Sequence, residues 1–391
     1  MNEKDLPIFE TPFKVRVQNC WKLFLEKENE LRLLMDNKAS SDEVVRKLDE
    51  LISPAFNYVY AEVGKNNDKY ELILNLDGDK SRAFPLIYFK NNAPKEVFEH
   101  WNILIGRQAS QKNMDKLKLR MGDSEVEASD IDLWCEWENN LANVSVYCKK
   151  LLPLLNANEN QAYNIVYMMI DYAVSELAEM KYIDKLELIE TPKEGSPIKL
   201  SGLMENFVAN LSYTEEEILS EEKYLGSYCG YRMEPDEKST DGKRKDVFVG
   251  STRLIPLLSD FMRGDTYTVD NLNKDGIAAG YLVFPLYGFT GENRGAQILD
   301  FRDMAADKLE QTTNSSFTFL GGASGINYGY IDFLSYDLKE TLDNAIPIFK
   351  EANIDWLMFR NFRQDAEGVT LYEEKPKKGI ANVIQKFFGK K

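Results

Sequence analysis

The chain has 391 residues, of which 43% are hydrophobic and 29% are charged, and its formal net charge is −16. This length exceeds what one ordinary core holds and predicts two domains, and the composition excludes general disorder. A uniformly acidic surface repels phosphate backbones, so we expect no nucleic-acid partner, whereas a basic protein would suit this charge.

The sequence carries no sign of export or of membrane insertion. Its first 20 residues mix charges of both signs, and no stretch approaches about 18 consecutive hydrophobic residues. The four cysteines lie far apart and form no C-x-x-C pair. We therefore expect a cytoplasmic protein with reduced thiols, in which Cys135 and Cys148 are buried within strands.

The first half of the chain contains helical and strand-like segments. Residues 13–37 place hydrophobic side chains along one helical stripe, and a second helix begins near Ser41, which we expect to cap it. A short helix is predicted at 81–94 and a mostly buried helix at 157–180. Strands are predicted at 56–64, 70–79, 101–108, 116–122, 131–137, 143–149 and 184–190.

The second half follows residues 191–200, where two prolines and a glycine predict a linker. A second polar, turn-rich break lies at 231–247. Helices are predicted at 296–311 and 337–352. A hydrophobic segment at 278–289 and strands at 316–320, 328–335 and 355–362 complete this half.

These elements predict the α+β class, with mainly antiparallel sheets packed by helices, because strands and helices interleave with hairpin-like neighbours. We expect an N-terminal α+β domain at 1–190 and a C-terminal α+β domain at 201–374, joined by the linker 191–200. Residues 375–391 form a separate basic tail.

The sequence lacks the residues that most catalytic and metal sites require. The single histidine, His100, excludes sites built on paired imidazoles. Two acidic segments, 75–81 and 270–276, do not meet the spacing of a calcium loop and are interpreted as turns. We therefore predict no catalytic residue, no metal site and no cofactor.

A glycine-rich stretch, GGASG at 321–325, is the most suggestive motif. Ile326 stands where a nucleophile elbow needs a glycine, and a phosphate loop would need Lys-Ser/Thr instead of Ile326-Asn327. An aromatic, strand-like run follows instead of a helix, so we interpret the glycines as a structural turn. If this loop binds a ligand, the binding residues would be Gly321, Gly322, Ser324, Gly325, Tyr328, Tyr330 and Asp332.

Nearby acidic residues have ordinary explanations. Asp337 is followed by Glu340 three residues later, which predicts a capping box. Asp300 and Asp303 share a predicted helix with Arg302, which is typical of a solvated face.

The tail 375–391 holds six lysines and no acidic residue. Its hydrophobic residues recur at helical spacing, which predicts an amphipathic helix with basic ends. Two binding surfaces for this helix stay open. One is the protein's own acidic body, and the other, as a weak peripheral contact, is an anionic membrane surface. The hydrophobic residues are Ile380, Val383, Ile384, Phe387 and Phe388.

Several stretches together resemble a family of uncharacterised bacterial cytoplasmic proteins of unknown function. The resemblance rests on residues 70–86, 245–265, 275–289 and 320–345, and it covers most of the chain. The C-terminal part is also loosely similar to domains of the ribonuclease E inhibitor (regulator B) type. The resemblance implies the fold and brings no activity, cofactor or catalytic residue.

Two functions remain open at this point. The first is a non-enzymatic protein-binding protein, an inhibitor or immunity-type factor for a basic partner, because no catalytic constellation accompanies the strong acidity. The alternative is an enzyme or a small-ligand-binding domain that uses the loop 321–325. A deep pocket with convergent polar groups at that loop would favour the alternative, and a flat surface would favour the first function.

Overall fold

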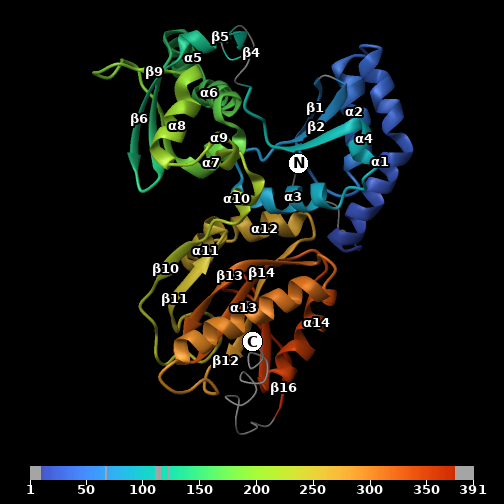
Figure 1. Cartoon of the computed structure of the whole chain (residues 1–391), viewed down its shortest axis with the longest axis vertical. Helices are drawn as coiled ribbons and strands as arrows, with labels where there is room; N and C mark the ends of the chain where they lie inside the picture. Colours follow the sequence, from blue (N-terminus) through green and yellow to red (C-terminus); the bar gives the residue numbers. More distant parts are fainter. Residues whose placement is uncertain (1–9, 67, 111–113, 115, 122–123, 375–391) are drawn as a thin grey trace. The chain divides into compact units, whose positions relative to one another are not determined.

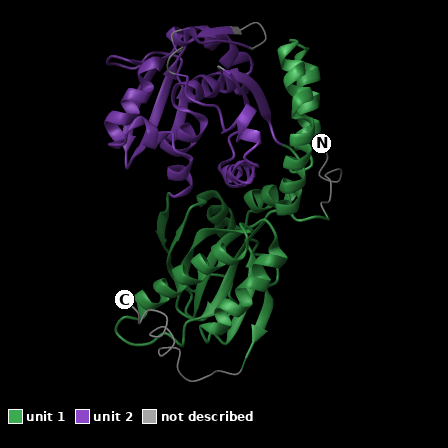
Figure 2. Ribbon diagram, turned by 45° about the vertical axis from the view of Figure 1, so that its right-hand side comes forward, with its two compact units in different colours: residues 1–58, 227–391 green, residues 59–226 purple. Residues whose placement is uncertain are grey.

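The computed structural model describes residues 10–374 except 67, 111–113, 115 and 122–123. The chain divides into two compact units, unit 1 (Met1–Tyr58 and Ser227–Lys391) and unit 2 (Val59–Gly226), which Figure 2 colours separately. The predicted domains 1–190 and 201–374, with a linker at 191–200, do not coincide with these two units. Strand β9 (Ile198–Lys199) falls within the predicted linker and pairs with a strand of unit 2.

Unit 1 is built on one seven-stranded sheet in which every neighbouring pair is antiparallel. Its central strands at 278–285 and 328–335 are mostly hydrophobic along their whole length and are buried on both faces. In spatial order the strands are β10 (Cys229–Arg232), β11 (Val247–Thr252), β13 (Phe317–Gly325), β14 (Tyr328–Ser335), β12 (Ala278–Pro285), β15 (Trp356–Asn361) and β16 (Val369–Glu373).

Helices cover both faces of this sheet (Figure 1). On one face, α13 (Arg294–Thr312) and α14 (Leu338–Glu351) pack Phe301 and Phe349 against Phe284 of β12, which fills a hydrophobic core. On the other face, α11 (Ile255–Arg263) places Phe261 edge-on to Tyr281 of β12, and α12 (Tyr267–Lys274) lies beside it.

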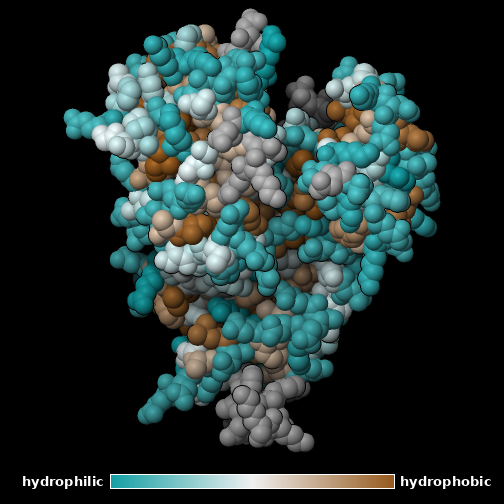
Figure 3. Space-filling model, turned by 45° about the horizontal axis from the view of Figure 1, so that its top comes forward, coloured by the Kyte–Doolittle hydropathy of each residue, from teal (hydrophilic) through white to brown (hydrophobic). Residues whose placement is uncertain are grey.

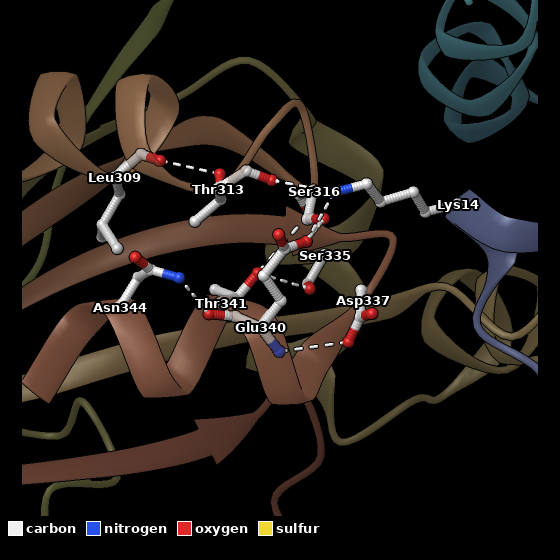
Figure 4. A network of polar contacts seen from close by, with 9 residues as sticks. All are labelled: Lys14, Leu309, Thr313, Ser316, Ser335, Asp337, Glu340, Thr341 and Asn344. Atoms are coloured by element: carbon white, nitrogen blue, oxygen red, sulfur yellow. Dashed lines mark hydrogen bonds and ion pairs between the residues drawn. The ribbon is translucent and has the colours of Figure 1, made fainter.

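The N-terminal helices belong to this unit although they begin the chain. In α1 (Phe13–Asp36), the backbone N–H of Lys14 donates to the carbonyl of Tyr336 at 3.0 Å, and its Nζ pairs with Glu340 at 2.6 Å. Figure 4 shows this lysine reaching the polar network at the start of α14, which includes Ser316. Long-range contacts therefore attach the first helix to the C-terminal sheet, which a linear division of the sequence could not reveal.

Helix ends follow local side-chain chemistry. Asp337 caps α14 as predicted, by accepting a hydrogen bond from the Glu340 N–H at 3.1 Å, while the Glu340 carboxylate turns to Lys14. The second helix, α2 (Ser41–Ile52), is capped by Ser40 and not by Ser41, because the Ser40 hydroxyl accepts from the Glu43 N–H.

Unit 2 combines helices with three smaller sheets. Two strand pairs, β2–β3 and β7–β8, are parallel, and the other pairs are antiparallel. The strands are β1 (Ala61–Asn66), β2 (Lys69–Leu74), β3 (Trp101–Ile105), β4 (Lys118–Met121), β5 (Ser124–Glu127), β6 (Asp132–Glu138), β7 (Leu141–Tyr147), β8 (Ile183–Leu188) and β9. The helices are α3 (Ala83–Asn91), α4 (Val97–His100), α5 (Leu152–Ala157), α6 (Glu159–Val174), α7 (Glu176–Tyr182), α8 (Leu203–Leu211), α9 (Glu215–Ile218) and α10 (Glu221–Leu225).

The helix predicted at 157–180 is interrupted. Ser175 has φ 76° and ψ 151°, a conformation that residues with side chains rarely adopt, and it separates α6 from α7. Its hydroxyl then caps α7 by accepting from the Ala178 N–H. The hydrophobic periodicity of the two helices is nearly continuous, so the sequence hides the break.

The α+β prediction with mainly antiparallel sheets is confirmed. Cys148 is buried as expected, whereas Cys135 is only half-buried. Within the described ranges, no helix is long and apolar enough to cross a bilayer. In Figure 3 the visible face is mainly hydrophilic, with hydrophobic side chains in separate groups.

Candidate functional site

The glycine-rich stretch lies inside strand β13 and does not form the predicted turn. The connection to β14 consists of Ile326 and Asn327 alone. Gly321 has φ 140°, and a Cβ there would collide with the backbone of Ser251 in the neighbouring strand. A Cβ on Gly325 would overlap the Asp246 carboxylate. The glycines are therefore required for close approaches within the sheet.

Because successive side chains of a strand point to opposite faces, the predicted binding residues lie on both faces of the sheet. Tyr330 and Asp332 lie on the face that carries Tyr281, and both are buried. Gly322 faces α13, because a Cβ there would contact the Arg302 side chain. The structure thus divides the predicted site into a buried polar cluster on one face and an open groove on the other.

The buried cluster surrounds Arg244. Its guanidinium pairs with Asp332, and each side chain is only 1% exposed. It also donates to the Tyr231 hydroxyl at 2.5 Å and lies 5.2 Å from the ring centres of Tyr281 and Tyr330. Burial alone would lower the pKa of Arg244, but the charge of Asp332 raises it overall, so the residue stays protonated.

Asp246 completes this cluster. Its carboxylate accepts from the Tyr330 hydroxyl and from the backbone N–H groups of Asn327 and Tyr328, at 2.9 and 3.0 Å. Burial and this neighbouring charge both raise the pKa of Tyr330. Because Asp246 and Arg244 come from the polar segment before β11, the cluster attaches that segment to the sheet.

The hollow beside Arg244 is small. It holds about 130 Å³ and is lined partly by Lys243, Phe261 and Met262. Pockets for small ligands typically hold about 300–1,000 Å³. Among the described residues, Asp332 Oδ2 is buried without a hydrogen-bond partner, but the space beside Arg244 is too small for an ordinary ligand.

On the opposite face, an open groove of about 530 Å³ lies between α13 and strands β11 and β13. Tyr228, which is 50% exposed, lies 6.4 Å from the ring centre of Phe319. Arg253 lies over the Tyr228 ring at 5.3 Å, and Arg302 lies over the Phe319 ring at 5.9 Å. Each of the two aromatic rings of the groove therefore has an arginine against one of its faces.

Acidic side chains follow the α13 side of this groove. Asp303, Asp307 and Glu310 line it, and Asp300 precedes them on the same side of the helix at i, i+3, i+7 and i+10. Asp303 pairs with Arg302 at 2.9 Å. Asp300 and Asp303 lie on an exposed helix face, as predicted. The exposure of Tyr228 was not predicted, because it depends on the sheet edge.

Unit 2 contains a second buried cluster that the sequence analysis also missed. Asp171, Glu176 and Glu179 are all buried around the helix break, where Arg107 pairs with Asp171 at 3.1 Å. Glu176 accepts three backbone N–H bonds, from Leu76, Asp77 and Arg107. Three acids within nine residues of a hydrophobic helical segment are the signal that could have revealed it.

The acids of this cluster are difficult to ionise. Burial raises the pKa of Glu179 to about 7, with Lys80 opposing and Glu176 adding to the shift. Burial, together with the charges of Glu176 and Glu179, also raises the pKa of Asp171. Across the described residues, no group of three or more such side chains is arranged to hold a metal ion.

Comparison with known proteins gave no match to a protein-family model, to a curated protein or to a solved structure.

Proposed function

We propose that this chain is a non-enzymatic protein-binding protein that holds a partner in the groove between α13 and the β11–β13 strands. The observation that carries the proposal is the exposed ring of Tyr228 beside the half-buried ring of Phe319, flanked by the acidic side of α13. Exposed aromatic rings that are held rigid lose little entropy on binding, and such rings are enriched at protein interfaces.

The acidity of the groove indicates the kind of partner. Four acids, Asp300, Asp303, Asp307 and Glu310, stand against two cations, Arg253 and Arg302. A partner segment with basic and hydrophobic side chains would complement this wall, and the net charge of −16 would accelerate the encounter. An inhibitor or immunity-type factor for a basic protein has this character.

Enzymatic or small-ligand use of 321–325 is less well supported. The groove has the volume of a ligand site, but its aromatic wall is half exposed, and a buried small-molecule site would enclose its ligand. Tyr330, Asp332 and Asp246 are occupied in the buried cluster. We further propose that the protein acts in the cytoplasm, in keeping with its sequence.

Charge reversal in the groove tests this function. Immobilised full-length protein should retain a specific basic protein from a lysate of its source organism and release it at raised salt. The double variant Asp303→Lys and Asp307→Lys should lose that protein at least tenfold. The matched control, Glu215→Lys and Glu216→Lys on the exposed α9 of unit 2, should retain it. Equal retention by both variants would contradict the proposal.

A further inference from the structure

The groove continues as a hydrophobic strip along α13. Val249 lies two residues before the lining residue Ser251 and therefore shares its face of β11. Leu299 lies four residues before Asp303 and shares its side of α13. Both side chains are exposed, at 37% and 44%. Together with Tyr228 and Phe319 they form a strip with acids along one side, which suits an amphipathic helix with basic residues.

The chain itself carries a segment with this chemistry. Residues 375–391 combine six lysines, no acid and five hydrophobic residues at helical spacing. This tail lies outside the described residues, and its attachment point is known. The backbone N–H of Glu374 donates to the backbone carbonyl of Asp355 at 2.7 Å, and its carboxylate pairs with Lys350 at 3.0 Å. These contacts fix the chain at the β16 edge.

The length of the tail determines whether it can bind in the groove of its own chain. Strand β16 is separated from the groove strands β13 and β11 by four and five strand spacings in the sheet, roughly 19 and 24 Å at about 4.8 Å each. The six Cα–Cα steps from Glu374 to Ile380, the first hydrophobic position, span at most about 21 Å when fully extended. Helices α13 and α14 cover the direct path across this face, so the chain would have to go around them. That longer path leaves the hydrophobic stripe too short to lie along the groove of its own chain.

We propose that the tail 375–391 of one copy binds as a helix in the groove of a second copy. The hydrophobic stripe from Ile380 to Phe388 would cover the strip around Val249, and lysines would face the acids of α13. This inference rests on the proposed function, because it names an occupant of the same groove. Reciprocal exchange of tails would give a closed dimer with two such contacts.

Complementation between two defective variants tests this pairing. One variant ends at Glu374 and keeps the groove, and the other, Val249→Lys with Asp307→Lys, keeps the tail. By sedimentation velocity at about 50 µM, the full chain should be mainly dimeric, and each variant alone should be mainly monomeric. An equimolar mixture of the two should recover heterodimers through a single tail contact, at least tenfold more than either variant alone. The control Val369→Lys, at the exposed β16 edge, should stay dimeric.

Other outcomes separate the possible occupants. A full chain that stays monomeric, or a truncated form that still dimerises, would overturn the tail proposal. Co-sedimentation of the full chain, but not of the truncated form, with anionic phosphatidylserine vesicles and without dimerisation would assign the tail to membranes instead. If the full chain stays monomeric but still retains the basic partner of the charge-reversal experiment, the proposed function stands while the tail proposal fails.

Discussion

In unit 1 the buried guanidinium of Arg244 faces one buried carboxylate, Asp332, inside a cage of aromatic rings. In unit 2 the guanidinium of Arg107 pairs with Asp171 and Glu62, and two further buried carboxyl groups, Glu176 and Glu179, lie at the same helix break. The Arg244–Asp332 pair is balanced in charge, whereas the acidic side chains around Arg107 outnumber it. The stability of unit 1 should therefore depend on an intact ion pair, and the stability of unit 2 should depend on pH.

The physical consequence differs between the two clusters. Removal of one partner from a balanced buried pair leaves a charge without compensation, which is costly at any pH where that charge persists. Excess acids relieve their repulsion and desolvation by binding protons. The following predictions test this difference, from the largest expected effect to the smallest.

Replacement of Arg244 should destabilise unit 1 most. Arg244→Met leaves Asp332 buried without its partner, and we expect a loss of about 3–5 kcal/mol in the free energy of unfolding. This loss is measured by urea unfolding, with hydrogen exchange of the β12 and β14 amides as the readout. The addition of Asp332→Leu should recover part of the loss. A control, Arg263→Ala in an exposed ion pair, should cost less than about 1 kcal/mol. Equal losses for Arg244→Met and Arg263→Ala would contradict the buried-pair account.

Glu179 should make unit 2 more stable in mild acid. Its pKa is about 7 in the folded chain and near 4.5 as a free side chain, so the folded state binds the proton more tightly. Its contribution to stability is fully present below pH 4.5 and is lost as the pH rises through 7. The groups that influence it are Lys80 and Glu176, with Tyr167 and Tyr224 also nearby.

The variant Glu179→Gln removes this titration. We expect it to be more stable than the wild type at pH 8, by up to about 3 kcal/mol, and to differ little at pH 4.5. Hydrogen exchange of α6 and α7 at the two pH values measures the difference. The exposed Glu187→Gln is the control and should change stability little at either pH. If the protection factors of the α6 and α7 amides in the wild-type chain are the same at pH 8 and pH 5, the assignment is contradicted.

Gly325 tests the close approach that holds the unit 1 cluster together. A valine there would displace the Asp246 carboxylate, and with it the hydrogen bond from Tyr330. We expect Gly325→Val to cost about 1–3 kcal/mol, measured by urea unfolding. Gly295→Ala, where a Cβ meets open space within α13, is the control and should be neutral or stabilising.

Ser324→Ala should have the smallest effect. Ser324 is half-buried and pairs in register with Gly329, away from the buried cluster on the other face. We expect stability to change by less than about 0.5 kcal/mol and retention of the basic partner to be unchanged. A large loss of binding with normal unfolding would show that the serine acts chemically.

Local features were predictable from the sequence, and long-range ones were not. The helix at 13–37, the Asp337 cap and the α+β class follow from periodicity and capping chemistry. The attachment of Lys14 to Glu340 joins residues 326 positions apart, which no local pattern encodes. The glycines of β13 were interpreted as a turn, because their close neighbours, Ser251 and Asp246, come from another strand and from the segment before it.

Site-specific photo-crosslinking tests the central claim that the groove is a protein-docking surface. A benzoylphenylalanine replaces Tyr228 in one variant of the full chain and Tyr287 in another, since both tyrosines lie in unit 1 and are 50% and 61% exposed. Irradiation in the source lysate should give a discrete adduct with a second polypeptide, either another protein or a second copy, from position 228 only. Excess unmodified protein should suppress this adduct. No adduct from position 228, or equal adducts from both positions, would contradict the account.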